Sequence, residues 1–409
     1  MGSGAVFMTL RFGRLWRHRC LCLCLLFFAV LPFRPGVVQA QPALPADSPS
    51  KAPASVAAGV SAGTSTSAPV SAWPARPTPG LQVPRLTGRL RAADLGLVVN
   101  LADPYSVAVG LHYQQARGLA EHQVLRLTLP QRPVLSREEF ETLQRSINSH
   151  FGPGTQALAL AWVAPYAVEC NAITGALAMG FDAELCRQSC AASRVSRYFN
   201  SATARPMEQL GFRPSMLLAA ASLQQAKALI DRGVAADGAL RSKARPTVSV
   251  MFQTTQDVAR NVRSALYPKA STLPGAGVQI EVGDLPAWAD APLLLMALTG
   301  SEKVNFAPKM NWAAGGLGDH LTSIGGDLLG AHGQSTALEW IDAGATASHG
   351  AVSEPCNHLQ KFPHPWVLLL NYLQGSTVIE AYWKSVAWPQ QSLFVGEPLA
   401  APFAPPLPP

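Results

Sequence analysis

The sequence predicts an α/β fold in which a mostly parallel sheet is flanked by helices. Short apolar runs of the kind found in buried strands alternate with amphipathic stretches of the kind found in helices. Parallel strands need crossover connections, and this alternation supplies them. The pattern extends over residues 85–403, which is enough chain for one large domain or for two lobes with a boundary near residue 240.

The elements follow one another from the start of this region. The helix at 136–151 is the most sharply defined, because Ser136 and Glu139 form a capping box at its start. The first half also contains strands at 95–100, 124–129 and 157–163 and a helix at 106–117. The second half contains a strand or turn at 216–221, strands at 247–253, 278–282 and 292–298, and helices at 222–232, 255–267, 334–343 and 377–388.

Residues 1–40 have the three parts of a cleavable secretory signal peptide. Four arginines between Arg11 and Arg19 form a basic start, residues 20–31 form an apolar run, and Val38-Gln39-Ala40 places small residues where a signal peptidase cuts. A retained membrane anchor is the alternative, but the run is shorter than the roughly 20 apolar residues that span a bilayer. We therefore expect a soluble periplasmic or extracellular protein that keeps no membrane span.

Charge and composition outside this leader bound the class of partner. The formal net charge is +7, and removal of the leader with its five arginines leaves about +2, which gives no strongly basic surface for nucleic acid or an anionic membrane. Residues 41–84 consist almost entirely of small residues and proline, so we expect a disordered linker. The proline-rich residues 404–409 predict a frayed tail.

Four cysteines remain after removal of the leader: Cys170, Cys186, Cys190 and Cys356. An even number in an oxidising compartment predicts two disulfide bonds, and the sequence does not choose among the three connectivities. Cys186 and Cys190 would share one face if their stretch were helical. A zinc site of four thiolates is the weaker alternative, because the chain lacks a second short-spaced pair.

Reactive side chains are concentrated in a glycine-rich segment at residues 315–326, which we expect to form a loop. Asp319, His320 and Ser323 place a carboxylate, an imidazole and a hydroxyl within five positions, a set that could supply a nucleophile and a base. The glycines permit sharp turns or close backbone approach to a ligand. Against catalysis, His320 and Ser323 would point to opposite faces of a strand, and glycines at a strand end can serve packing alone.

A second group lies at residues 349–358. His349, Glu354 and His358 have side chains that bind zinc and similar ions, but their spacing matches no helical ligand motif, and the prolines at 355, 363 and 365 predict a loop. We therefore expect no metal and no cofactor, and we expect Cys356 to be bridged rather than nucleophilic. The candidate site, at the carboxyl ends of neighbouring strands, consists of Asp319, His320, Ser323, His349 and Glu354.

Three motifs resemble those of an uncharacterised family of exported bacterial proteins. They are the run Asp319-His320-Leu321-Thr322-Ser323-Ile324-Gly325-Gly326, the stretch 343–350 leading to Glu354-Pro355-Cys356-Asn357, and the run Gly396-Glu397-Pro398-Leu399-Ala400. With residues 97–100, Ser106 and Arg117 earlier in the chain, the resemblance spans nearly the whole folded region. It implies no particular activity.

The order of elements also resembles that of the gingipain and clostripain group of caspase-like cysteine peptidases. In those enzymes a His-Gly follows one strand and a Cys follows the next. The corresponding positions here are Thr299-Gly300-Ser301 and Leu321-Thr322-Ser323. The resemblance therefore implies a caspase-like scaffold that lacks the Cys/His peptidase pair, and a shared fold does not fix the chemistry.

Three functions are consistent with the sequence. We prefer binding of a ligand or partner, either a small molecule or an envelope protein, at the 315–326 segment, because no complete catalytic set is visible. The second is hydrolysis by Ser323 with His320 or His349 as the base. The third is a structural or assembly role in the cell envelope, with residues 41–84 as a spacer.

We predict that the exported protein begins at Gln41. The small residues of Val38-Gln39-Ala40 direct cleavage to the following bond. Amino-terminal sequencing of the purified exported protein checks this expectation, and an intact Met1 would contradict it.

Overall fold

The computed structural model describes residues 82–405 except 243, 286–287 and 307–309, and these described residues belong to one compact unit. The predicted leader, nearly all of the predicted linker and residues 406–409 lie outside them. Within them, no helix is long and apolar enough to cross a membrane. The two ends of the described chain are packed against it: the carbonyl oxygen of Gln82 accepts a hydrogen bond from Asn200, and Ala404 is buried.

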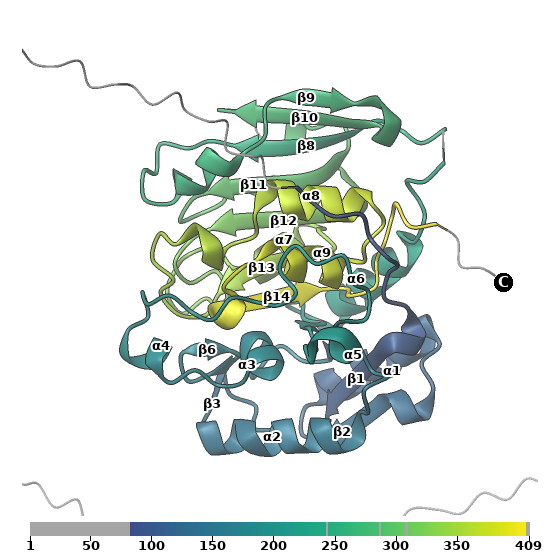
Figure 1. Cartoon of the computed structure of the whole chain (residues 1–409), viewed down its shortest axis with the longest axis vertical. Helices are drawn as coiled ribbons and strands as arrows, with labels where there is room; N and C mark the ends of the chain where they lie inside the picture. Colours follow the sequence, from purple (N-terminus) through teal and green to yellow (C-terminus); the bar gives the residue numbers. More distant parts are fainter. Residues whose placement is uncertain (1–81, 243, 286–287, 307–309, 406–409) are drawn as a thin grey trace, which may run out of the picture. The chain divides into compact units, whose positions relative to one another are not determined.

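An 11-stranded sheet forms the centre of the unit (Figure 1). In spatial order its strands are β2 (Val124–Leu127), β1 (Leu95–Asn100), β4 (Ala157–Leu160), β7 (Ser215–Leu217), β14 (Ser392–Gly396), β13 (Ala347–Ala351), β12 (Trp312–Leu321), β11 (Leu294–Gly300), β8 (Val248–Gln253), β10 (Val278–Gly283) and β9 (Ser271–Leu273). A smaller sheet contains β3 (Val134–Leu135), β5 (Ala167–Val168) and β6 (Asn171–Ala172).

The large sheet consists of two blocks of strands that run in opposite directions. β2, β1, β4, β7 and β14 are parallel to one another, and so are β13, β12, β11, β8 and β10. The blocks meet where β14 pairs antiparallel with β13, and β9 adds an antiparallel pair at the edge. Residue 240 lies in the connection that leads from the first block to β8.

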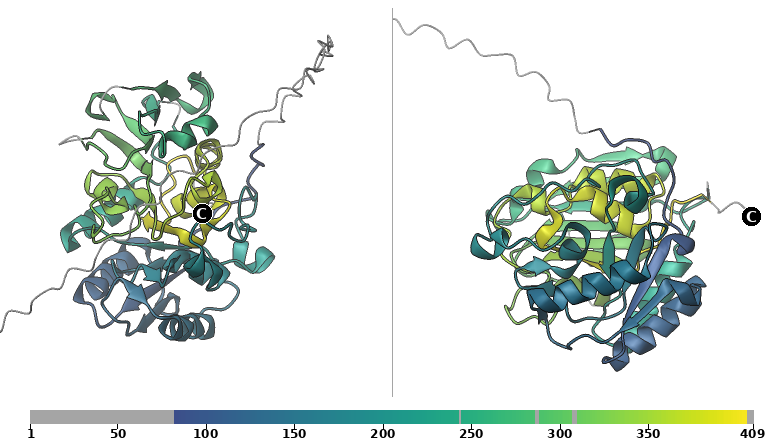
Figure 2. Two further views of the ribbon diagram at one scale, coloured as in Figure 1. Left: turned by 90° about the vertical axis from the view of Figure 1, so that its left-hand side faces the viewer. Right: turned by 60° about the horizontal axis from the view of Figure 1, so that its bottom comes forward.

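Helices lie on both faces of this sheet (Figures 1 and 2). They are α1 (Pro104–Arg117), α2 (Arg137–His150), α3 (Ile173–Met179), α4 (Glu184–Arg187), α5 (Pro206–Leu210), α6 (Leu223–Ala235), α7 (Ala337–Asp342), α8 (Pro365–Leu373) and α9 (Val378–Ser385). A mostly parallel sheet flanked by helices confirms the predicted α/β fold class.

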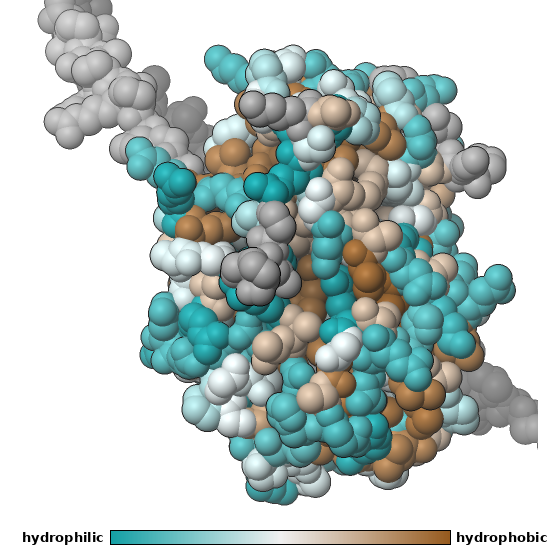
Figure 3. All heavy atoms as spheres, turned by 90° about the vertical axis from the view of Figure 1, so that its right-hand side faces the viewer, coloured by the Kyte–Doolittle hydropathy of each residue, from teal (hydrophilic) through white to brown (hydrophobic). Residues whose placement is uncertain are grey.

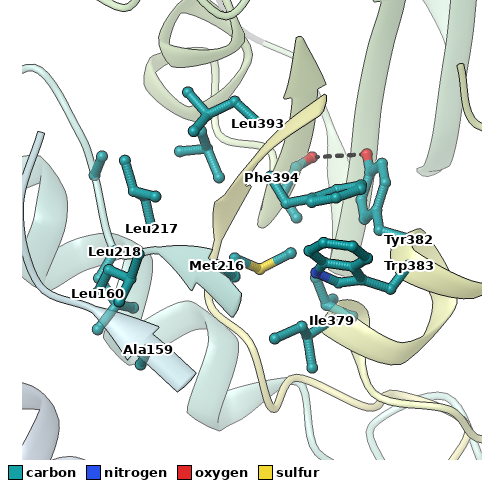
Figure 4. Close-up of a cluster of buried hydrophobic side chains, with 14 of the residues drawn as sticks. Ala159, Leu160, Met216, Leu217, Leu218, Ile379, Tyr382, Trp383, Leu393 and Phe394 are labelled. Atoms are coloured by element: carbon teal, nitrogen blue, oxygen red, sulfur yellow. Dashed lines mark hydrogen bonds between the residues drawn. The ribbon is translucent and has the colours of Figure 1, made fainter. Parts of the chain in front are cut away.

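An aromatic cluster joins α9 to the junction of the two blocks (Figure 4). Tyr382 and Trp383 of α9 pack against Phe394 of β14, with ring centroids 6.1 and 4.5 Å apart. The indole nitrogen of Trp383 donates to the carbonyl oxygen of Ser215 at the start of β7. All three rings are fully buried, so α9 holds β14 in place largely through apolar area removed from water.

Elements with continuous apolar runs or clear caps were predicted closely. The strand at 95–100 matches β1, and α2 begins directly after Ser136, whose hydroxyl accepts the amide of Glu139 as the capping box requires. The predicted helices at 106–117, 222–232, 334–343 and 377–388 correspond to α1, α6, α7 and α9, with ends that differ by a few residues.

The glycine-rich segment 315–326 was wrongly predicted to be a loop, because residues 315–321 belong to β12. Its glycines make room for rings: a Cβ on Gly318 would lie 2.2 Å from the ring of Trp340, and one on Gly316 would lie 2.4 Å from Trp312. Only residues 322–326 follow the strand as a loop. Tertiary packing therefore explains why this strand contains several glycines, a composition that in the sequence is typical of a turn.

Two further predictions were wrong for local reasons, and the condition attached to a third is not met. The predicted helix at 255–267 is reduced to a short 3₁₀ segment, Asn261–Leu266. The prolines after residue 354 do mark a loop, but His349 itself lies in β13, and Pro365 starts α8, where proline is tolerated at the first position. The segment containing Cys186 and Cys190 is not one helix, because α4 ends at Arg187.

Two disulfide bonds use all four cysteines, as predicted. Cys170 is bonded to Cys186, and Cys190 is bonded to Cys356. The bridges remove these cysteines from consideration as zinc ligands or nucleophiles. The second bridge joins the irregular segment after α4 to the loop after β13, far apart in the sequence.

We predict that Gly350→Ala lowers the free energy of unfolding by about 1–3 kcal/mol or more, the cost of overpacking a well-packed core. A Cβ at this position would lie 2.2 Å from the backbone of Gly325, which cannot move as a side chain can. Gly152→Ala is the matched control, because nothing lies within 4 Å of its Cβ. Urea denaturation checks both, and equal stability of the two variants would contradict the packing argument.

Candidate functional site

The strands β11, β12 and β13 lie side by side and end at the same edge of the sheet, which is the left-hand edge in Figure 1 and faces the viewer in the left panel of Figure 2. A hollow of about 310 Å³ opens at this edge. It is lined by Ala259, Arg260, Leu321, Thr322, Ser323, Glu354, Pro355, Cys356, Asn357 and Phe362. The carboxyl ends of parallel strands are where ligands collect in open α/β sheets.

Two of the five predicted site residues line this hollow, and they approach it from different strands. Ser323 follows β12 and is half-buried, whereas Glu354 follows β13 and is exposed. One carboxylate oxygen of Glu354 accepts the backbone amide of Cys356 at 2.8 Å. Among the described residues, which leave out 243, 286–287 and 307–309, the carboxylate forms no ion pair.

Arg260, which sequence reasoning missed, forms part of the wall but is already occupied. Its guanidinium pairs with Asp257 at 3.0 Å, lies 3.9 Å from Glu302, and donates to the hydroxyl of Thr322 at 3.1 Å. The Thr322 hydroxyl in turn donates to Gln334. Arg260 therefore fixes the loop after β12 more than it presents a free positive charge.

Asp319 does not reach the hollow, because it is fully buried on β12 beneath it. The guanidinium of Arg263, also buried, donates to one carboxylate oxygen. Burial by itself raises the pKa of Asp319, but the charge of Arg263 and the neighbouring His349 outweigh it and hold the pKa at about 2. Asp319 is therefore a carboxylate throughout the physiological range.

His349 lies next to Asp319 and is also fully buried. Its Nδ1 is 3.4 Å from the second carboxylate oxygen of Asp319, and neither of these two atoms has a hydrogen-bond partner among the described residues. Its Nε2 is 3.0 Å from the hydroxyl of Ser392, at the start of β14. Which of these two groups donates depends on which ring nitrogen of His349 carries a hydrogen.

His320 points to the opposite face of β12, as the alternation of strand side chains requires. Its Nδ1 accepts the indole N–H of Trp340 at 2.9 Å, and its Nε2 donates to the carbonyl oxygen of Ser335, also at 2.9 Å. Burial lowers the pKa of His320 to about 4. With both ring nitrogens occupied and only 1% of its surface exposed, His320 has no position from which to act as a base.

The five predicted residues thus form three separate groups. Ser323 and Glu354 share the hollow, Asp319 and His349 form a buried pair beneath it, and His320 belongs to the other face. No hydrogen bond joins Ser323 to either histidine among the described residues, so the predicted serine–histidine pairs are not formed. The same part of the chain holds no cluster of histidine, cysteine and carboxylate side chains that could bind a metal.

The residues that the sequence did not reveal are Arg260, Arg263, Phe362 and Ser392. Arg263 and Asp319 are 56 positions apart, and Ser392 and His349 are 43 apart, so no local motif connects them. The one available signal was Arg263, an arginine among apolar residues after a predicted buried strand.

No protein-family model matches the chain, and no curated protein matches it. Among solved structures, it is similar to one described as "Structure of Protease", with 11% identity and a TM-score of 0.40 over 67% of this chain and 62% of that one. It is also similar to the Arg-specific cysteine proteinase gingipain R, with 10% identity and a TM-score of 0.40 over 77% and 80% of the two chains. The chain thus spans less than two thirds of the first structure.

Likenesses at these scores say nothing of activity or ligands. Membership in an uncharacterised exported family stays a prediction.

We predict that His320 makes the protein less stable as the pH falls from about 6.5 to 4. In the unfolded chain the imidazole takes up a proton near pH 6.5, whereas in the folded protein it does so only near pH 4. The contribution of neutral His320 to the free energy of unfolding is therefore fully present above pH 6.5 and is lost as the pH falls toward 4. At pH 5 the free energy of unfolding is lower by about 2 kcal/mol, because each pKa unit corresponds to about 1.36 kcal/mol.

Urea denaturation of wild type and His320→Gln at pH 7.5 and 5 measures this contribution. The variant is expected to be less stable at pH 7.5 and to show a smaller drop between the two values. His122→Gln, in an exposed turn, is the control and should behave as wild type. The same pH dependence in wild type and His320→Gln would contradict the prediction.

Proposed function

We propose that this chain is an exported protein that binds a small molecule, or one side chain of a protein partner, in the hollow lined by Ser323 and Glu354. The observation that carries the proposal is the hollow itself, at the edge where β11, β12 and β13 end. At about 310 Å³ it is at the lower limit for ligand pockets, which suits a small group rather than a large cofactor.

The open groups in the hollow indicate what it recognises. Arg260 is neutralised by Asp257, whereas the Glu354 carboxylate and the Ser323 hydroxyl have accepting capacity to spare. A ligand that offers hydrogen-bond donors therefore fits better than an anion. Asn357 adds an amide that can both donate and accept.

Cysteine peptidase chemistry has no support in this hollow. Cys356 is the only cysteine in its wall and is bonded to Cys190, so no thiolate is present. Hydrolysis by Ser323 lacks a base, as the histidines are engaged elsewhere. Export is supported by the predicted leader and by two disulfide bonds, which persist in oxidising compartments. An envelope assembly role remains a prediction that rests on residues 41–84.

We predict that Glu354→Gln and Ser323→Ala weaken ligands of this hollow about tenfold or more, since a hydrogen bond to a charged group contributes about 1.5–3 kcal/mol. A library of amine- and amide-bearing fragments, screened by thermal shift and followed by calorimetric titration, provides the probes.

Glu138→Gln and Ser146→Ala are the matched controls, because these residues line a different hollow, of about 270 Å³, beside α2. Fragment affinities should be unchanged in both controls. Fragments that bind wild type and the two site variants equally well would contradict the proposal, as would an absence of binders in the whole library.

A further inference from the structure

The row Asp319–His349–Ser392 crosses β12, β13 and β14 on one face of the sheet. Register places Leu317 beside Ala347, so Asp319 and His349 are neighbours, and the antiparallel pair places Ser392 opposite Ala351. The contacts are 3.4 Å from Asp319 to Nδ1 and 3.0 Å from Nε2 to the Ser392 hydroxyl. This is the order carboxylate, imidazole, hydroxyl that activates a serine for nucleophilic attack.

We infer that Ser392 is a latent nucleophile for acyl-type transfer, activated by His349 and covered by Phe362. The inference is independent of ligand binding at Ser323 and Glu354. It uses a serine and a base that lie beneath the hollow rather than in its wall.

The hydrogen bonds of Ser392 favour this assignment. Its hydroxyl lies 3.0 Å from Nε2 of His349 and donates to the carbonyl oxygen of Lys361 at 3.2 Å, a long bond that the single hydroxyl hydrogen can leave for Nε2. The Asp319 carboxylate, 3.4 Å from Nδ1, favours the tautomer of His349 with its hydrogen on Nδ1. In that tautomer Nε2 can take the serine hydrogen.

Phe362 is the cover. Its ring packs edge-on against His349, with centroids 6.1 Å apart, and is itself only 2% exposed. It lines the hollow of Ser323 and also a neighbouring apolar hollow of about 270 Å³, which contains Leu266, Leu359 and His364. Space thus lies on two sides of the ring that packs against His349, and we expect displacement of this side chain to open the row to reagents.

The reaction that the row supports balances without a cofactor. The Ser392 oxygen attacks the carbonyl carbon of an ester, and its proton passes to Nε2 of His349. The ester C–O bond then breaks, and the leaving alcohol takes that proton. Water hydrolyses the acyl-serine by the same route and restores the hydroxyl. A fluorophosphonate reports the first step alone, because the serine oxygen bonds to phosphorus and fluoride leaves.

The test uses a biotinylated fluorophosphonate on the purified protein, with the modified residue identified by peptide mass spectrometry. Phe362→Ala should label at Ser392 at least about tenfold faster than wild type. Adding His349→Gln to Phe362→Ala should slow labelling by about a hundredfold or more, the contribution expected of a general base. Adding Ser392→Ala should abolish it, whereas adding Ser146→Ala, on the exposed face of α2, should change nothing.

A merely structural polar row would not respond in this way. Phe362→Leu, which keeps more of the packing, replaces Phe362→Ala if near-ultraviolet circular dichroism shows that the alanine variant is unfolded. Absence of a label on Ser392 in the folded variant overturns the inference, and so does labelling that is unaffected by His349→Gln. Label on Ser323 instead of Ser392 overturns it too.

Discussion

The ion pair between Arg263 and Asp319 is the contact on which the edge of β11, β12 and β13 depends. Both side chains are almost fully buried, so each charge is tolerated only because the other faces it. The guanidinium also donates to the carbonyl oxygen of Thr299 at the end of β11. One arginine therefore ties the ends of β11 and β12 together and keeps Asp319 charged. The charged Asp319 in turn faces Nδ1 of His349, whose Nε2 lies 3.0 Å from the Ser392 hydroxyl.

Strand alternation separates what the sequence groups together. Asp319 and His320 are adjacent in the chain, yet one faces Arg263 and the other faces Trp340. The first belongs to a charged row, and the second to a neutral network closed on itself. Ser323 lies beyond the end of the strand and joins neither. Asp319, His320 and Ser323 therefore lie in three different chemical environments within five residues. Only the environment of Ser323 is open to a ligand.

The sequence predicts the fold class and the capped helices because these signals are local, as Ser136 and Glu139 of α2 illustrate. It also predicts that Ser323 and Glu354 come together, and both line one hollow, although their role as a site stays a prediction. It does not predict β12 or β13, because the glycines in these strands are required by close contacts with residues distant in the sequence. Gly318 packs against Trp340, and Gly350 packs against Gly325. Pairings such as His349 with Ser392 are equally non-local. The strands and pairings that the sequence does not predict depend on tertiary contacts, and not on weak secondary-structure propensity.

The reversal of β14 explains why a serine lies at this edge at all. If β14 ran parallel to β13, its first residue would lie at the opposite edge, away from the ends of β11 and β12. Because the pair is antiparallel, the start of β14 meets the end of β13, and Ser392 reaches His349 diagonally across the ladder. The same junction joins the two blocks of the sheet, and Phe394 anchors it to α9 (Figure 4).

Figure 3 shows the opposite side of the molecule, to the right in Figure 1, where patches of hydrophobic residues lie between hydrophilic ones. The topology that connects the blocks also brings the buried row next to Phe362, which lines the hollow.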